Sequence, residues 1–184
     1  MYAPVILQSD WQEPVSILAA LAHEDYAVGL ISDGSAERGR WSYVAARPEE
    51  VLSLGGEEGR DPFSALSILI GSSTGADRSI DPDHPPFQGG VIGLASYELG
   101  ARSEPVTLAR SQGWPDLVCA RYSSLLAFDH LHRKLFVVGC GSNPQQAADL
   151  ASSWLALPRP TAFEGRLAQG FEAAASNAAY EANV

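Results

Sequence analysis

Three polar residues that lie close together in the sequence are the first candidates for chemistry. Asp129, His130 and His132 stand between two hydrophobic runs, and imidazole and carboxylate groups are common metal ligands. On a strand the two histidines would share a face, but within a turn they need not. Because hydrophobic runs on both sides indicate a hairpin, we interpret this segment as a polar turn and assign no metal site to it.

A second candidate is a group of three glycines, Gly89, Gly90 and Gly93. Glycine-rich loops can surround a phosphate group, but that arrangement needs a strand before the glycines and a helix after them. Residues 91–99 themselves have the composition of a strand. We therefore expect these glycines to allow a bulge or the close approach of another backbone.

No residue of the chain is assigned a catalytic role. The sequence holds no His-Glu-x-x-His, Walker or Cys-x-x-Cys motif. Lys134, the only lysine, adjoins the predicted turn, where its ammonium is expected to be solvated and unreactive. Cys119 and Cys140 lie on two strand-like runs, so a facing pair stays open, but we expect buried free thiols.

Composition favours one domain with a hydrophobic core and excludes several classes of partner. Of the 184 residues, 46% are hydrophobic and 18% are charged, which is typical of a chain that folds. The formal net charge is -10 and the arginines are scattered, so nucleic acid is a poor partner. No run is long enough to span a membrane and the first residues do not resemble a secretion signal. We expect a cytoplasmic protein.

Three segments have the apolar spacing and the start signals of helices. They are residues 10–23, 61–70 and 143–157. Asp10 and Glu13 have the spacing of a capping box. Asp61 and Asn143 each precede a proline, which is favoured at the first helical position.

Five strand-like runs lie between these helices. Residues 26–32, 40–47 and 50–54 are expected to form an antiparallel meander. Residues 87–100 follow, and residues 117–140 hold two strands that form a hairpin. The strands and helices do not alternate as βαβ units. The pattern favours an α+β fold with a mainly antiparallel sheet meander and about three packing helices.

The carboxyl end has a different character. Residues 1–157 are predicted to form one domain, and residues 158–175 read as a linker. Ser176 or Asn177 could then begin another helix. Two interpretations stay open for this end: a disordered tail, or the truncated start of a second domain.

Four segments together resemble one family in their order and spacing. They are RWSYVAARP (40–48), PFQGGVIGLASYELG (86–100), WPDLVCARYSSLLAFDH (114–130) and YEANV (180–184). They are similar to the amino-terminal region of component I of the chorismate-utilising synthases, namely anthranilate synthase and aminodeoxychorismate (para-aminobenzoate) synthase. Each segment is moderately specific, and the resemblance extends over nearly the whole chain.

The resemblance implies a two-part enzyme. In this family the amino-terminal domain packs against a larger chorismate-binding domain, which holds the catalytic residues and binds Mg²⁺. Residues 158–184 would be the linker and the start of that domain, so none of the catalytic residues falls within this chain. The fragment alone is expected to be inactive and to expose apolar surface where its partner domain would pack. The complete enzyme would use ammonia from a glutamine amidotransferase subunit.

Details within these segments bear on the product. Residues 87–90 and 40–43 look closer to aminodeoxychorismate synthase, which acts in folate biosynthesis. Anthranilate synthases tend to carry Leu-Leu-Glu-Ser where this chain has residues 29–32, with Ile31 in place of the glutamate. The alternatives are an anthranilate synthase of tryptophan biosynthesis and a non-enzymatic module that binds an amino acid or another protein.

By position, five residues match the tryptophan-binding motif of the family: Ser32, Arg38, Gly39, Arg40 and Trp41. A hydroxyl and backbone groups can hold the head of an amino acid while an aromatic wall packs on indole. The alternative is that Trp41 belongs to the core, Arg40 is an ordinary surface charge and Ser32 ends a strand. Both interpretations stay open at this point.

Overall fold

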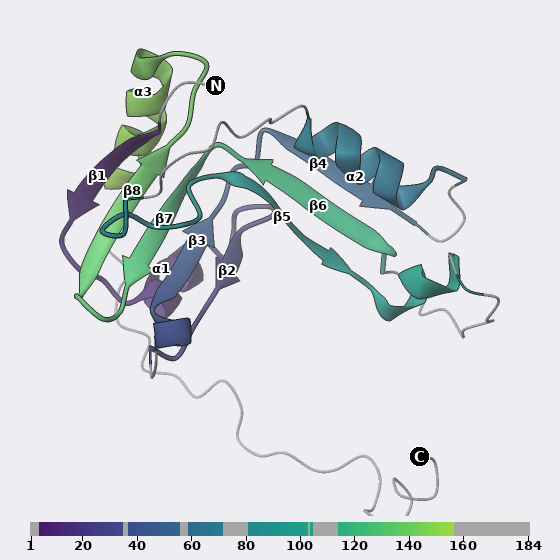
Figure 1. The fold of residues 1–184 in the computed structure, drawn as a ribbon, viewed down its shortest axis with the longest axis horizontal. Helices are drawn as coiled ribbons and strands as arrows, with labels where there is room; N and C mark the ends of the chain where they lie inside the picture. Colours follow the sequence, from purple (N-terminus) through teal and green to yellow (C-terminus); the bar gives the residue numbers. More distant parts are fainter. Residues whose placement is uncertain are drawn as a thin grey trace, which may run out of the picture.

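Two antiparallel sheets, packed against each other, form the centre of the protein in the computed structural model (Figure 1). The structure describes residues 4–34, 37–55, 59–71, 81–102, 104 and 114–156. The predicted α+β class, with antiparallel sheets and three α-helices, is confirmed. Residues 158–184 lie outside the described residues, so the predicted domain boundary after residue 157 stays a prediction.

The first sheet has five strands. In spatial order they are β1 (Val5–Ser9), β8 (Lys134–Gly139), β7 (Ser124–Asp129), β3 (Trp41–Ala45) and β2 (Val28–Leu30). Strands β7 and β8 pair directly, with Asp129 opposite Lys134. The hairpin predicted around the Asp-His-Leu-His turn is therefore confirmed for these two strands.

The second sheet has three strands and corrects two predictions. In spatial order they are β4 (Glu50–Leu54), β6 (Leu117–Tyr122) and β5 (Gly90–Ala95). The predicted hairpin arm is really two strands, because β6 and β7 are separated by Ser123 and join different sheets. The predicted meander also breaks after β3: Arg47 takes a left-handed φ of 56°, Pro48 follows, and β4 pairs with β6.

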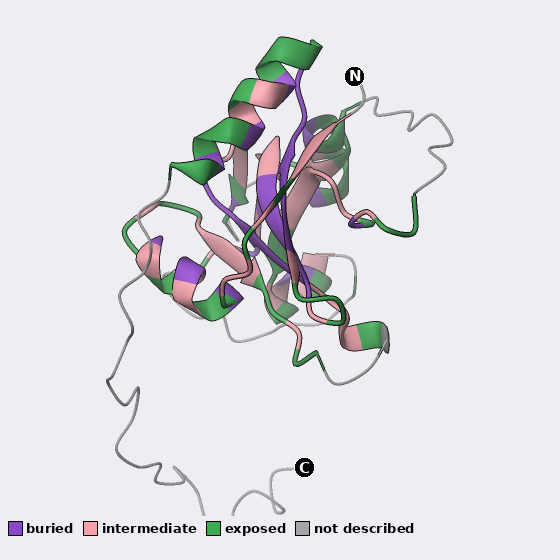
Figure 2. Cartoon of the chain, turned by 90° about the vertical axis from the view of Figure 1, so that its left-hand side faces the viewer, coloured by how far each residue is buried: buried purple, intermediate pink, exposed green. Residues whose placement is uncertain are grey.

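The side chains of each sheet alternate between two faces and so build three hydrophobic clusters. The outer face of the first sheet packs on α1 and α3 through Ile17, Leu21, Val44, Ala46, Leu126, Phe128, Leu135, Val137, Ala151 and Trp154. A second cluster lies between the two sheets. The third joins the second sheet to α2. Buried residues accordingly gather in the central strands and on the inner side of the helices (Figure 2).

The three α-helices are α1 (Pro14–Ala20), α2 (Pro62–Ile70) and α3 (Pro144–Leu155). The predicted caps of α2 and α3 are confirmed, since Asp61 accepts a hydrogen bond from the Ser64 amide and Asn143 accepts one from the Gln146 amide. The predicted start of the first helix is wrong. A helix capped by Asp10 would need a hydrogen bond from the amide of residue 14 to the Asp10 carbonyl, and Pro14 has no N–H. The helix begins at Pro14 itself.

Two short 3₁₀ segments, η1 (Glu37–Gly39) and η2 (Tyr97–Arg102), complete the described elements. Cys119 and Cys140 are buried thiols that form no disulfide, as predicted. Gly93 permits the close approach expected of it, because a Cβ there would clash with the Cys119 sulfur and the Val118 carbonyl. Among the described helices, none has the length and apolar character needed to cross a membrane.

Gly139 on β8 provides a test of how α3 packs on the sheet. A Cβ at this position would lie 2.6 Å from the Ala151 nitrogen and would also clash with the Ala147 carbonyl. The clashing atoms belong to the backbone of α3, so the helix would have to move away from β8 to relieve the clash. We therefore expect Gly139→Ala to lower the free energy of unfolding by about 1–3 kcal/mol. Urea denaturation measures the change.

Gly55→Ala is the matched control, since a Cβ at Gly55 would have no neighbour within 4 Å. Its effect should stay below about 1 kcal/mol. Equal effects of the two substitutions would contradict the close packing of α3 on β8.

Candidate functional site

The five residues predicted to bind a ligand lie around one end of the first sheet, where β2 ends and β3 begins. Ser32 follows β2, Arg38 and Gly39 belong to η1, and Arg40 leads into Trp41 at the start of β3. The pairing of β2 with β3, which places Leu30 opposite Tyr43, brings the two ends of this segment together. The arrangement thus depends on the short loop that η1 occupies.

Ser32 is held through the side chain of Ser42. The Ser32 amide donates a hydrogen bond of 2.9 Å to Ser42 Oγ, and Ser42 is fully buried. Ser42 Oγ also lies 2.7 Å from Nε2 of His130, whose ring packs edge-on against Trp11. Within the described residues the hydroxyl of Ser32 itself forms no hydrogen bond, so it remains available to a ligand.

Arg40 forms a strong ion pair with the buried carboxylate of Asp129. Its Nε lies 3.1 Å from both carboxylate oxygens and its Nη2 lies 2.6 Å from Oδ2. Nδ1 of His132 is 2.8 Å from the same Oδ2. Burial alone would raise the pKa of Asp129, but the hydrogen bonds from Arg40 and His132 outweigh it and lower the pKa to about 2.

Trp41 is anchored between this ion pair and the core. The guanidinium carbon of Arg40 lies 4.8 Å from the centre of the Trp41 ring, a cation–π arrangement. The ring stacks on Tyr43 at 6.5 Å and packs on Phe136 at 6.0 Å. Arg40, with 20% of its side chain exposed, is therefore not an ordinary surface charge, and it fixes the orientation of Trp41.

The remaining two predicted residues have different surroundings. Arg38 is exposed and forms no hydrogen bond or ion pair with any described residue. At Gly39 a Cβ would lie 2.8 Å from Oδ1 of Asp33, so the loop closes tightly on itself there. The structure thus brings Arg40 and Trp41 together, links Ser32 to the same strand, and leaves Arg38 open to solvent.

The Asp-His-Leu-His turn is a polar hydrogen-bonded structure. Asp129 accepts hydrogen bonds from the backbone amides of Leu131 and His132 in addition to its ion pair. No three His, Cys, Asp or Glu side chains among the described residues are placed to hold a metal ion. The turn instead supplies the carboxylate that fixes Arg40.

Sequence reasoning missed Ser42 and Trp11, and it placed Asp129 in a polar turn without connecting it to Arg40. The pairing of β3 with β7 places Trp41 opposite Asp129, so the strand register would have located Asp129 beside Arg40. Ser42 shares the outer face of β3 with the buried Val44, because side chains alternate along a strand. No local signal connects Trp11 to His130, because the contact spans most of the domain.

A second feature is an apolar groove beside β2 with a volume of about 410 Å³. It is lined by Tyr26, Ala27, Val28, Leu30, Ile92, Gly93, Leu94, Trp114, Pro115, Val118, Ala120 and Tyr122. The second sheet extends past the edge strand β2 here, and no described helix or strand covers its inner face there (Figure 1). Leu94 is 56% exposed and Trp114 is 70% exposed, in agreement with the expected exposed apolar surface.

The ion pair predicts a defined dependence of stability on pH. The pKa of Asp129 is about 2 in the folded state and about 3.9 in an unfolded chain. A lowered pKa contributes stability above the unfolded value, and that contribution is lost as the pH falls through the folded value. We expect the stability gap between the wild type and Asp129→Asn to narrow by about 2 kcal/mol from pH 5 to pH 2.

Urea denaturation of both proteins at each pH measures this gap. Asp83→Asn, at an exposed carboxyl, controls for the substitution and should change stability by less than about 0.5 kcal/mol at neutral pH. A gap that stays constant from pH 5 to pH 2 would contradict the lowered pKa.

Comparison with known proteins finds several that are similar to this chain. No protein-family model matches the chain. Among curated proteins, anthranilate synthase component 1 of Streptomyces coelicolor is 30% identical over 169 residues, which cover 85% of this chain and 32% of the relative. The corresponding protein of Thermus thermophilus is 34% identical over 153 residues, covering 76% of this chain and 32% of the relative. Aminodeoxychorismate synthase component 1 of Salmonella typhimurium is 36% identical over 95 residues, covering 50% of this chain and 20% of the relative.

A solved structure shows the same fold. The match is anthranilate synthase component I of Streptococcus pneumoniae, with a TM-score of 0.51 and 21% identity over 84% of this chain and 36% of that chain. The chain spans about a third of the length of the first relatives that it matches. By these matches the chain is homologous to part of the component I proteins of anthranilate synthase and aminodeoxychorismate synthase.

Proposed function

We propose that this chain is the amino-terminal domain of component I of a chorismate-utilising synthase. The observation that carries the proposal is the similarity to component I proteins along 85% of the chain, together with the order of the motifs quoted above. Because the chain spans 32% of that relative, we assign the chorismate site, the Mg²⁺ ion and the catalytic residues to a separate chorismate-binding domain. This chain would serve as its scaffold.

The apolar groove is the surface that we assign to that second domain. Leu30, Leu94 and Trp114 expose large apolar side chains around one concave face, and such a patch is typical of a surface that another domain covers. The groove begins at β2, two residues before Ser32. A domain seated there would therefore also contact the Ser32–Trp41 loop.

For the product we favour aminodeoxychorismate, a precursor in folate biosynthesis, with ammonia supplied by a glutamine amidotransferase subunit. Ile31, which is 42% exposed, presents a hydrocarbon side chain where the resemblance places a glutamate in anthranilate synthases. Anthranilate formation is the second candidate, and it is favoured by the similarity to the anthranilate synthase components of Streptomyces coelicolor and Thermus thermophilus. Either enzyme would act on small soluble metabolites in the cytoplasm.

Assays of product formation test this proposal. The 184-residue chain incubated with chorismate, Mg²⁺ and ammonia should give no product by mass spectrometry, because we assign the catalytic residues to another domain. A longer protein that begins with this chain should give 4-amino-4-deoxychorismate.

The outcomes separate the candidates. Anthranilate from the longer protein would establish the second candidate. Turnover by the 184-residue chain alone would overturn the assignment of catalysis to another domain. A longer protein that binds an amino acid or another protein, but leaves chorismate unchanged, would instead indicate a non-enzymatic module.

We also propose that the Ser32–Trp41 loop contributes to a tryptophan site. The groups that remain available there are the hydroxyl of Ser32 and the guanidinium of Arg38, which bond to no described residue. Arg40 is already engaged by Asp129 and would act by positioning Trp41 and its neighbours. The two arginines should therefore respond differently to substitution.

In the longer protein, Arg38→Ala should weaken tryptophan binding about tenfold, since it removes a charged hydrogen bond worth about 1.5 kcal/mol, and should leave thermal stability unchanged. Arg40→Ala should lower the melting temperature as well, because it leaves the buried Asp129 carboxylate without its main partner. Calorimetric titration and thermal denaturation measure the two effects. Unchanged binding in Arg38→Ala would argue against this site.

A further inference from the structure

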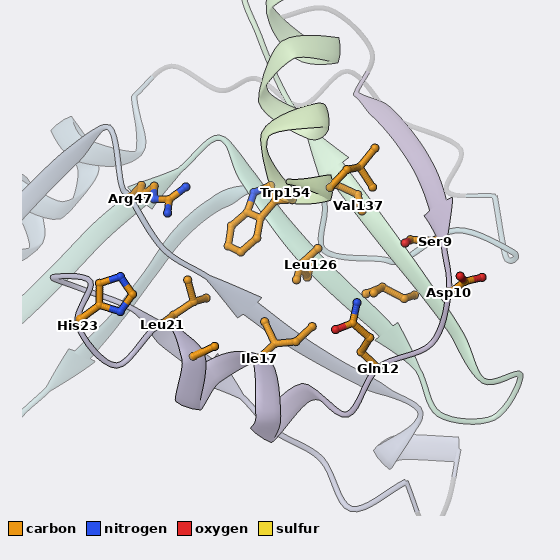
Figure 3. Close-up of a pocket in the computed structure, with 13 residues that line it drawn as sticks. Ser9, Asp10, Gln12, Ile17, Leu21, His23, Arg47, Leu126, Val137 and Trp154 are labelled. Atoms are coloured by element: carbon orange, nitrogen blue, oxygen red, sulfur yellow. The ribbon is translucent and has the colours of Figure 1, made fainter. Parts of the chain in front are cut away.

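A cavity of about 290 Å³ lies on the outer face of the first sheet, between α1 and α3. Its middle is apolar and is lined by Ile17, Leu21, Leu126, Leu135, Val137 and Trp154. Figure 3 shows the Trp154 ring extending from α3 toward the space above α1. The cavity is on the other side of the sheet from the groove, and none of the five predicted ligand residues lines it.

The two ends of the cavity are polar and differ in charge. His23 and Arg47 lie at one end, and Gln12 with Ser9 and Asp10 lies at the other (Figure 3). Gln12 turns its amide toward the apolar middle in the same view. Neither the Gln12 amide nor the Ser9 hydroxyl is hydrogen-bonded to a described residue. Such an arrangement resembles small-molecule sites, in which a few polar groups orient a mainly apolar body.

Arg47 is placed to receive an anion. Its Nε lies 3.0 Å from Oε1 of Glu24 and its Nη2 contacts the same oxygen, whereas Nη1 bonds to no described residue. Glu24 offsets part of the positive charge but does not line the cavity. The edge of the guanidinium that includes Nη1 can still donate hydrogen bonds to a carboxylate, whose planar geometry matches that of the guanidinium.

We propose that this cavity binds a small aromatic monocarboxylate. The carboxylate would lie at the Arg47 end, the ring would pack on Trp154 and Leu21, and a polar substituent opposite the carboxylate would face the Gln12 amide. The carboxylate of Asp10 repels an anion at the far end and so favours this single orientation. The proposal does not depend on the proposed function, because the cavity is formed by α1, α3 and the first sheet alone.

Three probes that differ in one group test the charge preference. They are para-hydroxybenzoate, para-hydroxybenzyl alcohol and para-hydroxybenzylamine, titrated into the 184-residue chain by calorimetry. We expect para-hydroxybenzoate to bind with a dissociation constant on the order of 0.1–1 mM, at least about fivefold more tightly than the alcohol and more tightly still than the amine. Equal or tighter binding of the amine, or no saturable binding of the benzoate, would overturn the proposal.

Two pairs of variants locate the binding site. Arg47→Gln should weaken para-hydroxybenzoate about tenfold and leave the alcohol unchanged. Arg133→Gln is its control, because Arg133 is also exposed, has a similar left-handed φ of 52° and pairs with a glutamate outside the cavity. Ala20→Leu should fill the cavity and abolish binding, whereas Ala19→Leu on the exposed side of the same helix should not.

Nuclear magnetic resonance gives a direct signal from the cavity wall. The indole N–H of Trp154 donates a hydrogen bond of 3.0 Å to Ser124 Oγ, so its resonance can be assigned with Trp154→Phe. Para-hydroxybenzoate should shift this resonance and leave that of the exposed Trp114 in place. Binding that survives Ala20→Leu, or that shifts Trp114 and not Trp154, would place the ligand elsewhere and refute the assignment.

Discussion

The passage of the chain from one sheet to the other at Ser123 determines where every candidate site lies. Strand β6 of the second sheet ends at Tyr122, and strand β7 of the first sheet begins at Ser124. The Cys140 amide donates a hydrogen bond of 2.7 Å to the Ser123 carbonyl between them. Because β6 and β7 are almost continuous, the two sheets share one hydrophobic layer, which includes Tyr122 and Leu125. The second sheet then projects beyond β2 and creates the groove, while α1 and α3 remain on the far face of the first sheet.

The polar network at the end of β3 has a structural role whatever ligand it binds. Asp129 is 1% exposed, and a buried carboxylate is costly unless charged hydrogen-bond donors surround it. Arg40, His132 and two backbone amides supply those donors. The same guanidinium then holds the Trp41 ring. A ligand at this loop would meet a rigid aromatic wall whose position is already determined, which lowers the entropic cost of binding.

Local patterns in the sequence were enough for the helices α2 and α3 and for the β7–β8 hairpin. Asp61 and Asn143 cap their helices as their sequence context indicates, because the capping interaction involves residues only three apart. The predicted start of α1 is wrong because the capping-box spacing of Asp10 and Glu13 favours a start that needs an amide at Pro14, which has none. The placement of β4 in the second sheet could not be predicted, since its partner β6 follows more than sixty residues later.

The candidate site shows the same division between local and distant contacts. Ser32, Arg38, Gly39, Arg40 and Trp41 are predicted from their match to the family's tryptophan-binding motif, which lies within ten consecutive residues. The residues that fix them, Asp129 and His130, are about ninety positions away, and only the strand register connects them. That register is the pairing of β3 with β7, which places Trp41 opposite Asp129 and joins strands far apart in the sequence. Single-sequence reasoning could therefore identify the loop but not the carboxylate that orients it.

The groove, the cavity and the Ser32–Trp41 loop lie on different parts of the two sheets. The groove uses the inner face of the second sheet beyond β2, whereas the cavity uses the outer face of the first sheet. A domain that covers the groove would therefore leave the cavity open. One physical connection between the cavity and the Ser32 loop is the segment from Ser9 to Gln12, which lines the cavity and carries Trp11 against His130. Because His130 contacts the serine that holds Ser32, a ligand that moved this segment would act on the loop through a chain of three direct contacts.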